Sequence, residues 1–122
     1  MIKMNFCVHK HDDISAADFH DYWLSKHRPL VESVRGALNI KKYVQNHGAF
    51  SELGDMAIAQ RGMTSGYDGL AELWWESEET LQAAFISPQG IDAGAMLVED
   101  EAKFIDLAKS TIFFSEEHVI FE

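Results

Sequence analysis

The sequence predicts a single α+β domain whose strands and helices follow the order β-α-β-β-α-β. Its 122 residues suit one domain around one hydrophobic core. Segments in which apolar and polar side chains alternate, as in half-buried strands, are interleaved with segments that repeat at the helical period. We therefore expect one domain spanning residues 1–122 and one functional surface.

The chain opens with a predicted strand and a capped helix. Apolar and polar side chains alternate from Ile2 to His9, which is typical of a half-buried strand. Ser15, with Asp18 three residues later, is typical of a helix N-cap with an acidic first turn. A helix is therefore expected to begin at about Ser15 and to end near Gly36.

The apolar residues of this first helix define its buried face. They fall within a stripe about 60° wide and are Phe19, Trp23, Leu30 and Val34. His27 lies just beside this stripe. Pro29 lacks a backbone donor and clashes with the carbonyl of Ser25, so the helix should kink or tighten immediately after His27.

The middle of the chain predicts two strands joined by a long segment. Residues 38–47 and 68–76 have strand-like alternation, and in the second of these Leu70, Glu72 and Trp74 should face one way and Ala71, Leu73 and Trp75 the other. Residues 48–67 have no steady period. So long a loop in a small domain is usually functional or mobile, which makes it a candidate lid.

The last third predicts a split helix and a closing strand. Ser77 should cap a short helix that breaks at residues 87–90, and a second helical stretch is expected from about Gly94 to Ser110. Asp100 lies on the edge of its apolar face. Residues 112–121 should form the fourth strand, with a bulge or a departure from the sheet at residues 115–117.

This order of elements matches the ferredoxin-like arrangement, in which the helices cover one face of a four-stranded antiparallel sheet. The other face is then bare. Because strands one and three present apolar groups to it, we expect a homodimer formed through the sheet face.

Composition excludes several classes of function. Twenty acidic residues against ten Lys and Arg give a net charge of -10, which repels phosphate backbones and argues against nucleic-acid binding. No apolar run is long enough for a membrane helix, and the N-terminus does not resemble a signal peptide, so a cytoplasmic location is expected. Cys7 is interpreted as a packing residue.

Several motifs together resemble the EthD-domain family, part of the group of dimeric α+β barrel proteins. The first helix, from Phe19 to Leu30, resembles the family pattern F-x-x-Y-W-x-x-x-H-x-P-L. Similar segments follow along almost the whole chain: Tyr43-Val44-Gln45, Tyr67 to Trp74, Glu99 to Asp106, and Glu117-His118-Val119.

The resemblance implies a substrate class more firmly than a reaction. Members of the family are linked to the breakdown of organic compounds, some related proteins resemble dehydratases, and general descriptions call the domain an oxidoreductase. Relatives with the same barrel act on small, mostly apolar rings in a pocket between helices and sheet. Analogy at the level of the fold does not select among these reactions.

His27 and Asp100 are the candidate catalytic residues. An imidazole can act as acid or base near neutral pH, because its ordinary pKa of about 6.5 moves easily with burial or a nearby carboxylate; a core histidine held by one backbone hydrogen bond is the alternative. Asp100, if charged, needs a partner such as an imidazole. The sequence leaves two roles open for Asp100, a structural salt bridge and a catalytic dyad with an imidazole.

The candidate substrate-binding residues are aromatic or lie near element ends. Flat apolar substrates suit ring surfaces, and core packing is the alternative for each ring. The candidates are Tyr22, Trp23, Tyr43, His47, Trp74 and His118.

Neither a metal nor a cofactor is expected. His9 and His11 with Asp12 and Asp13 look superficially like metal ligands, but no further histidine or cysteine has a fixed spacing to them. There is no glycine-rich phosphate loop. Haem is disfavoured because haem-binding relatives use a histidine on the second helix, and residues 77–110 contain none.

Two functional hypotheses follow. The first is a cofactor-independent isomerase, dehydratase or oxidoreductase that acts on a small apolar or aromatic compound with His27 as acid or base. The second is a non-catalytic dimeric module that binds such a ligand or supports a partner oxidative enzyme.

Overall fold

The computed structural model describes residues 1–64 and 66–122. Four strands and five α-helices are described, with a π-helical turn at Trp23–His27 and a short 3-10 turn at Leu107–Lys109. In chain order they are β1 (Ile2–Val8), α1 (Ala16–Tyr22), α2 (Arg28–Ser33), β2 (Lys42–His47), α3 (Ser51–Gln60), β3 (Gly69–Trp75), α4 (Glu78–Ile86), α5 (Pro88–Glu101) and β4 (Thr111–Ser115).

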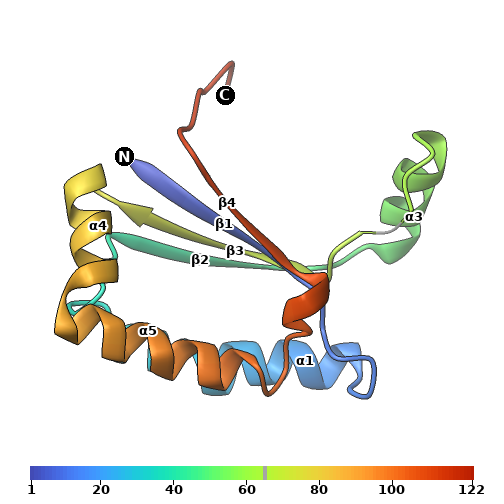
Figure 1. Ribbon diagram of the computed structural model, residues 1–122. Coiled ribbons are helices and arrows are strands. Elements are labelled where there is room, and N and C mark those ends of the chain that lie inside the picture. The colour runs from blue at the N-terminus through green and yellow to red at the C-terminus, as the bar shows by residue number, and fades with distance from the viewer. Residues whose placement is uncertain (65) are drawn as a thin grey trace.

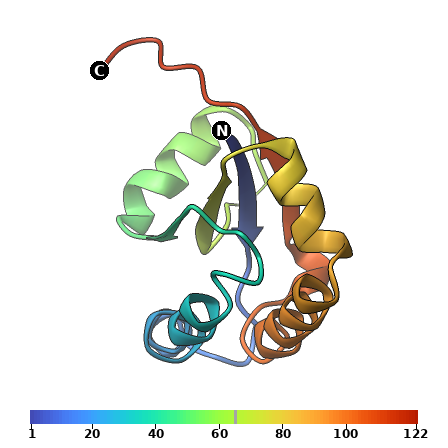
Figure 2. The same ribbon diagram turned by 90° about the vertical axis from the view of Figure 1, so that its left-hand side faces the viewer.

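The four strands form one antiparallel sheet in the order β2-β3-β1-β4. Helices α1, α4 and α5 lie on one face of this sheet (Figures 1 and 2). Phe6 of β1 pairs with Ala71 on one side and Ile112 on the other, so the inward side chains of the three strands stand in one row. The structure thus confirms the predicted α+β class with helices on one face.

The first helical segment, which comprises α1, the π turn and α2, changes its hydrogen-bond pattern at Trp23–His27. Ser15 caps it as expected, accepting a hydrogen bond from the backbone N–H of Asp18. The backbone N–H of Arg28 bonds to the carbonyl of Trp23, five residues back, which makes Trp23–His27 a π turn between α1 and α2. Pro29 offers no N–H to continue the α ladder. The distortion spans Trp23–His27 and ends at His27, whereas the sequence predicted a kink or a tightening immediately after His27.

The second helical region differs from the predicted stretch at residues 94–110. Helix α5 begins at Pro88, directly after α4, because the Ser87 side chain accepts from the N–H of Gly90 and starts a new helix. A Cβ on Gly90 would lie 1.8 Å from the carbonyl oxygen of Ala84, so the two helices meet where only glycine fits. Helix α5 ends at Glu101, since the chain then turns to form a bridge between Lys10 and Ile105.

The long segment at residues 48–67 contains helix α3, which was not predicted. None of the residues of α3 is buried, and Figure 1 shows the helix extending away from the end of the sheet. A helix that buries no face needs no apolar period, so periodicity could not reveal it. Within this segment Ser65 lies outside the described residues, and the lid role remains a prediction.

Two predicted strands are shorter than expected. Strand β2 begins at Lys42 instead of Leu38, because Leu38 uses its carbonyl to accept from the indole of Trp75 at 2.7 Å. Strand β4 ends at Ser115, and residues 116–122 leave the sheet, which was one of the two outcomes predicted there.

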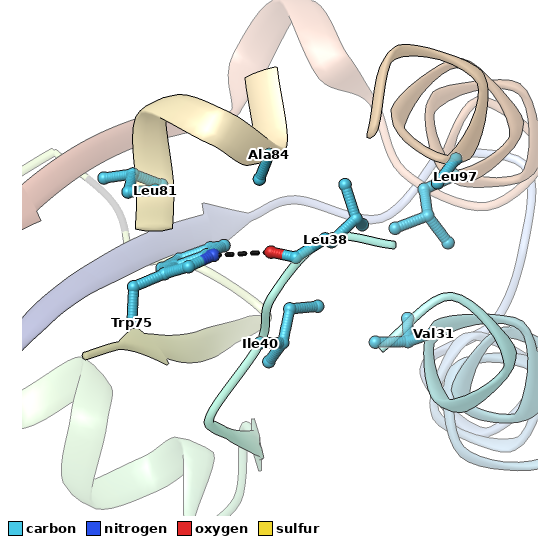
Figure 3. Packing of buried hydrophobic residues seen from close by; sticks show 8 residues of the cluster. Val31, Leu38, Ile40, Trp75, Leu81, Ala84 and Leu97 are labelled. Atoms are coloured by element: carbon cyan, nitrogen blue, oxygen red, sulfur yellow. Dashed lines mark hydrogen bonds between the residues drawn. The ribbon is translucent and has the colours of Figure 1, made fainter. Parts of the chain in front are cut away.

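The core lies between the sheet and the helices in two neighbouring clusters. Figure 3 shows the cluster near α4, where Val31 from α2 and Leu97 from α5 extend into the space beside Leu38. The second cluster packs Phe19, Trp23 and Phe104 against β1 and β3 and fixes the N-terminal end of the first helix. Together they hold the first helix and α5 against the same face of the sheet.

Within residues 1–64 and 66–122, no helix covers the opposite face of the sheet, and this face carries polar contacts. Lys3 and Glu72 form an ion pair at 2.7 Å, and Asn5 bonds to Ser115. Trp74 lies on this face, and its indole donates to Glu117. The face is therefore more polar than the alternation of the strands indicated.

No helix in the described part of the chain is long and apolar enough to cross a membrane.

Candidate active site

A cavity of about 310 Å³ lies between the helices and the sheet, within the size range of small-molecule sites. Its walls come from all four strands, the π turn and helices α2, α4 and α5, and they are almost entirely apolar. Six of the residues that line it are among those labelled in Figure 3: Val31, Leu38, Ile40, Trp75, Ala84 and Leu97. Three titratable side chains also line it, namely His27, Tyr43 and Glu101.

His27 reaches this cavity because it ends the π turn. Its side chain is buried, with 5% of the residue exposed, and its ring packs against Phe104 with centroids 5.1 Å apart. The amide of Gln45 donates to the carbonyl of Trp23, 3.1 Å away, at the start of the same turn. A side chain from β2 thus stabilises the irregular backbone that carries the imidazole.

Asp100 is the hydrogen-bond partner of the His27 imidazole. Nδ1 of His27 lies 2.8 Å from Oδ2 of Asp100, and the hydroxyl of Tyr22 donates to Oδ1 at 2.7 Å. Lys103 Nζ lies 3.5 Å from the same Oδ1. The predicted need of Asp100 for a partner is thus met by an imidazole, a phenol and a lysine.

The pKa values of this group are set by burial and by the hydrogen bonds. Burial lowers the pKa of His27, although Asp100 acts in the opposite direction. Burial acts to raise the pKa of Asp100, but the hydrogen bonds from Tyr22 and His27 outweigh it, and the net direction is downward. Burial and the hydrogen bond to Asp100 raise the pKa of Tyr22 to about 12.

These directions fix the tautomer of His27. An ionised carboxylate is only an acceptor, so Nδ1 of His27 must be its protonated nitrogen. In a neutral imidazole the other nitrogen, Nε2, then carries a lone pair. No hydrogen bond of Nε2 is found with the described residues. In this tautomer a neutral His27 has its acceptor nitrogen at Nε2.

Glu101 was not among the candidate residues predicted from the sequence. It lines the cavity, and burial followed by the charge of Asp100 raises its pKa to about 7. The sequence did contain a pattern that indicates this position. Glu101 follows Leu97 by four residues and precedes Phe104 by three, so it belongs to the apolar face of this helix. An acidic residue inside an apolar stripe is the pattern that marks such a position.

Three other predicted site residues lie at or near the cavity. Trp23 and Tyr43 line it, and the hydroxyl of Tyr43 accepts from the amide of Gln45 at 2.7 Å. His47 lies at the end of β2, where its ring stacks on Trp23 with centroids 4.5 Å apart. It lines a separate groove with Tyr43 and Gln45.

Three predicted substrate-binding residues do not line the cavity. Tyr22 is not part of the cavity wall, and its hydroxyl donates a hydrogen bond to Asp100. Trp74 faces the other side of the sheet, since its register in β3 is opposite to that of Ala71, Leu73 and Trp75, which line the cavity. His118 is exposed in the segment after β4. Within one chain these three side chains are not brought to the cavity.

The structure does not bring the metal-ligand-like residues His9, His11, Asp12 and Asp13 together in one site. Among the residues that the structure describes, no group of three or more His, Cys, Asp or Glu side chains is placed to hold a metal ion. His11 uses Nε2 on the carbonyl of Ala102, at 2.7 Å. Nδ1 of His9 is 3.8 Å from Asp68.

Solved structures of similar shape share this fold. An EthD-like protein from Ralstonia eutropha aligns over 98% of this chain and 94% of its own, with a TM-score of 0.62 and 20% identity. An EthD family protein from Bacillus halodurans aligns over 97% of this chain and 100% of its own, with a TM-score of 0.60 and 18% identity.

A third neighbour is described by its fold and assembly. This dimeric protein of ferredoxin-like fold from Bacteroides fragilis aligns over 95% of each chain, with a TM-score of 0.59 and 10% identity. No significant match was found among curated proteins.

The sequence also matches a family model, that of the EthD domain, over residues 11–108. The matched range contains the first helix with His27, the strands β2 and β3, and the helix that carries Asp100 and Glu101. Together with the fold it shares with the Ralstonia and Bacillus proteins, this match shows that the chain belongs to the EthD-domain family.

Proposed function

We propose that this chain is a cofactor-independent enzyme that moves a proton on a small apolar or aromatic compound, with His27 as the base. The observation that carries the proposal is the Nδ1 hydrogen bond of His27 to Asp100 at 2.8 Å, on a histidine that lines an apolar cavity. A neutral imidazole with its second nitrogen unpaired is suited to general base catalysis near neutral pH.

Asp100 and Tyr22 are positioning residues in this proposal. The carboxylate keeps the proton of His27 on Nδ1 and stabilises the imidazolium that forms when Nε2 takes up a proton. Tyr22 holds the other oxygen of the carboxylate, so the three side chains form one connected chain of hydrogen bonds. Such preorganisation spares the site from reorienting when the charge develops.

Proton transfer of this kind supports three reactions. Isomerisation removes a proton from one carbon and returns one to another, and dehydration removes a proton and then a hydroxyl group. An oxidoreductase reaction begins in the same way if the resulting carbanion passes its electrons to an acceptor. The first two need only acid and base groups, so we place isomerase or dehydratase activity first.

We further propose that the chain forms a homodimer through the uncovered face of the sheet. The Bacteroides neighbour of the same fold is described as dimeric, and on this face Phe113 of β4 is 54% exposed. Phe113→Lys should then shift the protein toward monomer in analytical ultracentrifugation, with Lys26→Gln, an exposed residue of the π turn on the helix-covered face, as control. Equal dimer populations in both variants would contradict the proposed interface.

A binding or accessory module is the second candidate function. The observation that favours it is the scarcity of polar groups on the cavity wall, because a purely apolar pocket can hold a ligand without acting on it. In that case His27 serves packing and its replacement leaves cellular activity unchanged.

The test follows deuterium exchange from solvent into aromatic lactones and polyketide-like compounds, using the unmodified protein and His27→Gln. We expect His27→Gln to retain ligand binding while the exchange rate falls by about 10²-fold or more. His11→Gln, which keeps a donor for the carbonyl of Ala102, is the matched control. Exchange at the unmodified rate in His27→Gln would contradict the enzyme proposal.

A further inference from the structure

Asp100 and Glu101 are adjacent at the end of α5, but their carboxyl groups lie in different surroundings. Asp100 bonds to His27 and Tyr22, behind the imidazole. Glu101 lines the cavity itself. Successive helical residues are rotated by about 100°, which explains how one helix end supplies both a support for the imidazole and a group that faces the ligand space.

Glu101 has no hydrogen bond or ion pair with the described residues. The described residues that line the cavity include no lysine and no arginine. A carboxylate without a cation or donors is costly in an apolar cavity, and burial together with the nearby charge of Asp100 raises the pKa of Glu101 to about 7. At pH 6 most of the protein therefore carries Glu101 as a neutral acid with an O–H to donate.

We propose that Glu101 is the acid partner of His27, and that the ligand of this cavity is an uncharged aromatic carbonyl compound whose oxygen accepts a hydrogen bond from Glu101. This inference rests on the proposed role of His27 and assigns the second half of the same proton transfer. Proton transfer to and from a carbonyl compound requires a neutral base and a neutral acid in the same cavity. His27 is the neutral base of this pair, and Glu101 is the neutral acid.

The step balances without a further reactant. Nε2 of His27 takes a proton from the carbon next to the carbonyl, and the electron pair of that C–H bond becomes a C=C bond. The carbonyl π pair moves to oxygen, which takes the proton of Glu101. The products are an enol, an imidazolium and a carboxylate. Reversal returns the proton to the same carbon and exchanges it with solvent. In a compound with a second C=C bond conjugated to the enol, the imidazolium returns its proton to the far carbon of the dienol and the enol O–H returns its proton to Glu101, which gives an isomer and restores both residues.

The charges that develop remain paired. The imidazolium of His27 is stabilised by Asp100, and the carboxylate of Glu101 forms at the moment when a cation appears on the same cavity wall. An anionic ligand lacks any such partner, because the described residues that line the cavity include no lysine or arginine and Glu101 adds a second acidic group. Uncharged ketones and lactones are therefore the expected ligands, and carboxylates and phosphates are not.

The pH dependence follows from the groups that surround Glu101. These are Asp100, which precedes it on α5, His27 of the π turn and Tyr43 of β2, the latter two on the cavity wall. Activity should fall on the acid side as His27 becomes protonated. It should fall on the alkaline side as Glu101 loses its proton near pH 7.

The experiment compares the unmodified protein with Glu101→Gln, Glu101→Asp and His27→Gln on a panel of uncharged bicyclic ketones and lactones, each paired with the aromatic carboxylate of the same size. α-Tetralone and 1-naphthoate are the first pair. Calorimetry measures binding, and NMR follows deuterium exchange at the carbon next to the carbonyl. Circular dichroism confirms that each variant is folded.

We expect the ketone to bind at least tenfold more tightly than its carboxylate partner. Glu101→Gln should bind the ketone within a few fold, because an amide still donates, but should exchange deuterium about 10²-fold more slowly and lose the alkaline limb of the pH profile. Glu101→Asp, which restores a proton, should recover part of the rate.

The outcomes separate the two proposals. Exchange lost in His27→Gln but unchanged in Glu101→Gln, with the alkaline limb intact, would overturn the role of Glu101 and leave the role of His27 standing. Tighter binding of the carboxylates than of the ketones would overturn the ligand class. No exchange by the unmodified protein on any compound of the panel would overturn both proposals.

Discussion

His27 and Asp100 are separated by 73 residues, and Nδ1 of the histidine lies 2.8 Å from Oδ2 of the aspartate. Each residue is 5% exposed. The pair joins the π turn of the first helix to the last turn of α5, so it links the two helices that flank the cavity. One contact therefore bears on both the stability of the fold and the protonation of the candidate base.

The first prediction concerns Asp100→Asn. Removal of the charge should lower the pKa of His27 further, because Asp100 acts to raise it. An asparagine amide can also donate to Nδ1 and move the proton of the neutral ring to Nε2. Imidazole ¹⁵N shifts followed against pH report both changes.

The same substitution should lower the free energy of unfolding by about 1.5–3 kcal/mol, the range for a hydrogen bond to a charged group. Asp92→Asn, exposed on the same helix, is the matched control and should have no effect on His27. If the tautomer and the pKa of His27 are the same in Asp100→Asn as in the unmodified protein, the carboxylate does not orient the ring.

The second prediction concerns Tyr22→Phe, which deletes the hydroxyl on Asp100. The pKa of Asp100 should rise, since this hydrogen bond is the largest influence that lowers it. The free energy of unfolding at neutral pH should fall by about 1–2 kcal/mol. Urea titration measures the change, and Tyr67→Phe is the control.

The effect of Tyr22→Phe should depend on pH. A carboxyl whose pKa is lowered in the folded state adds stability above its unfolded pKa, and this stability is lost as pH falls through the folded value. The gap between Tyr22→Phe and the unmodified protein should therefore narrow in acid. A gap of constant size from neutral to acid pH would show that Tyr22 acts by packing alone.

The third prediction concerns the stability of Glu101→Gln against pH. Burial raises the pKa of Glu101 from its ordinary 4.5 to about 7, so the folded protein holds this proton more tightly than the unfolded chain. The unmodified protein should lose stability relative to Glu101→Gln as pH rises from 5 to 8, by about 1–3 kcal/mol.

Urea titrations of both proteins at several pH values measure this difference. Glu99→Gln, on an exposed residue of the same helix, should follow the unmodified protein. Parallel curves for Glu101→Gln and the unmodified protein would mean that the cavity does not shift the titration of Glu101.

The fourth prediction concerns Gly69→Ala. A Cβ at Gly69 would lie 2.5 Å from Cζ3 of Trp23 and 2.8 Å from the carbonyl oxygen of Asn46. Since the indole is buried and the carbonyl belongs to β2, neither can move freely. The variant should be less stable by about 1–3 kcal/mol and should disturb the stack of His47 on Trp23.

Thermal unfolding and the ring proton shifts of His47 test this effect. The control is Gly54→Ala in α3, where an added Cβ meets nothing within 4 Å and should raise stability by about 0.5–1 kcal/mol. Gly69→Ala with unchanged stability and unchanged His47 shifts would show that the Trp23 side of the cavity tolerates displacement.

The fold class, the four strands and the place of His27 beside the buried stripe of the first helix could all be predicted from the sequence. These features are local, because a strand or an amphipathic helix repeats its pattern over successive residues of one segment. Pro29 likewise predicted an irregular backbone in this helix. Asp100 stood out as a charged residue at the edge of an apolar face that needs a partner.

Which side chains meet could not be predicted before the helices and strands were packed together. That Asp100 faces His27, that Glu101 faces the cavity and that Trp74 faces away depends on how helices and strands pack, and side-chain alternation does not say which face of a sheet the helices cover. Helix α3 had no buried face to reveal it. The candidate base was thus visible in one segment, while its support and its proposed acid partner come from a helix that folding brings beside it.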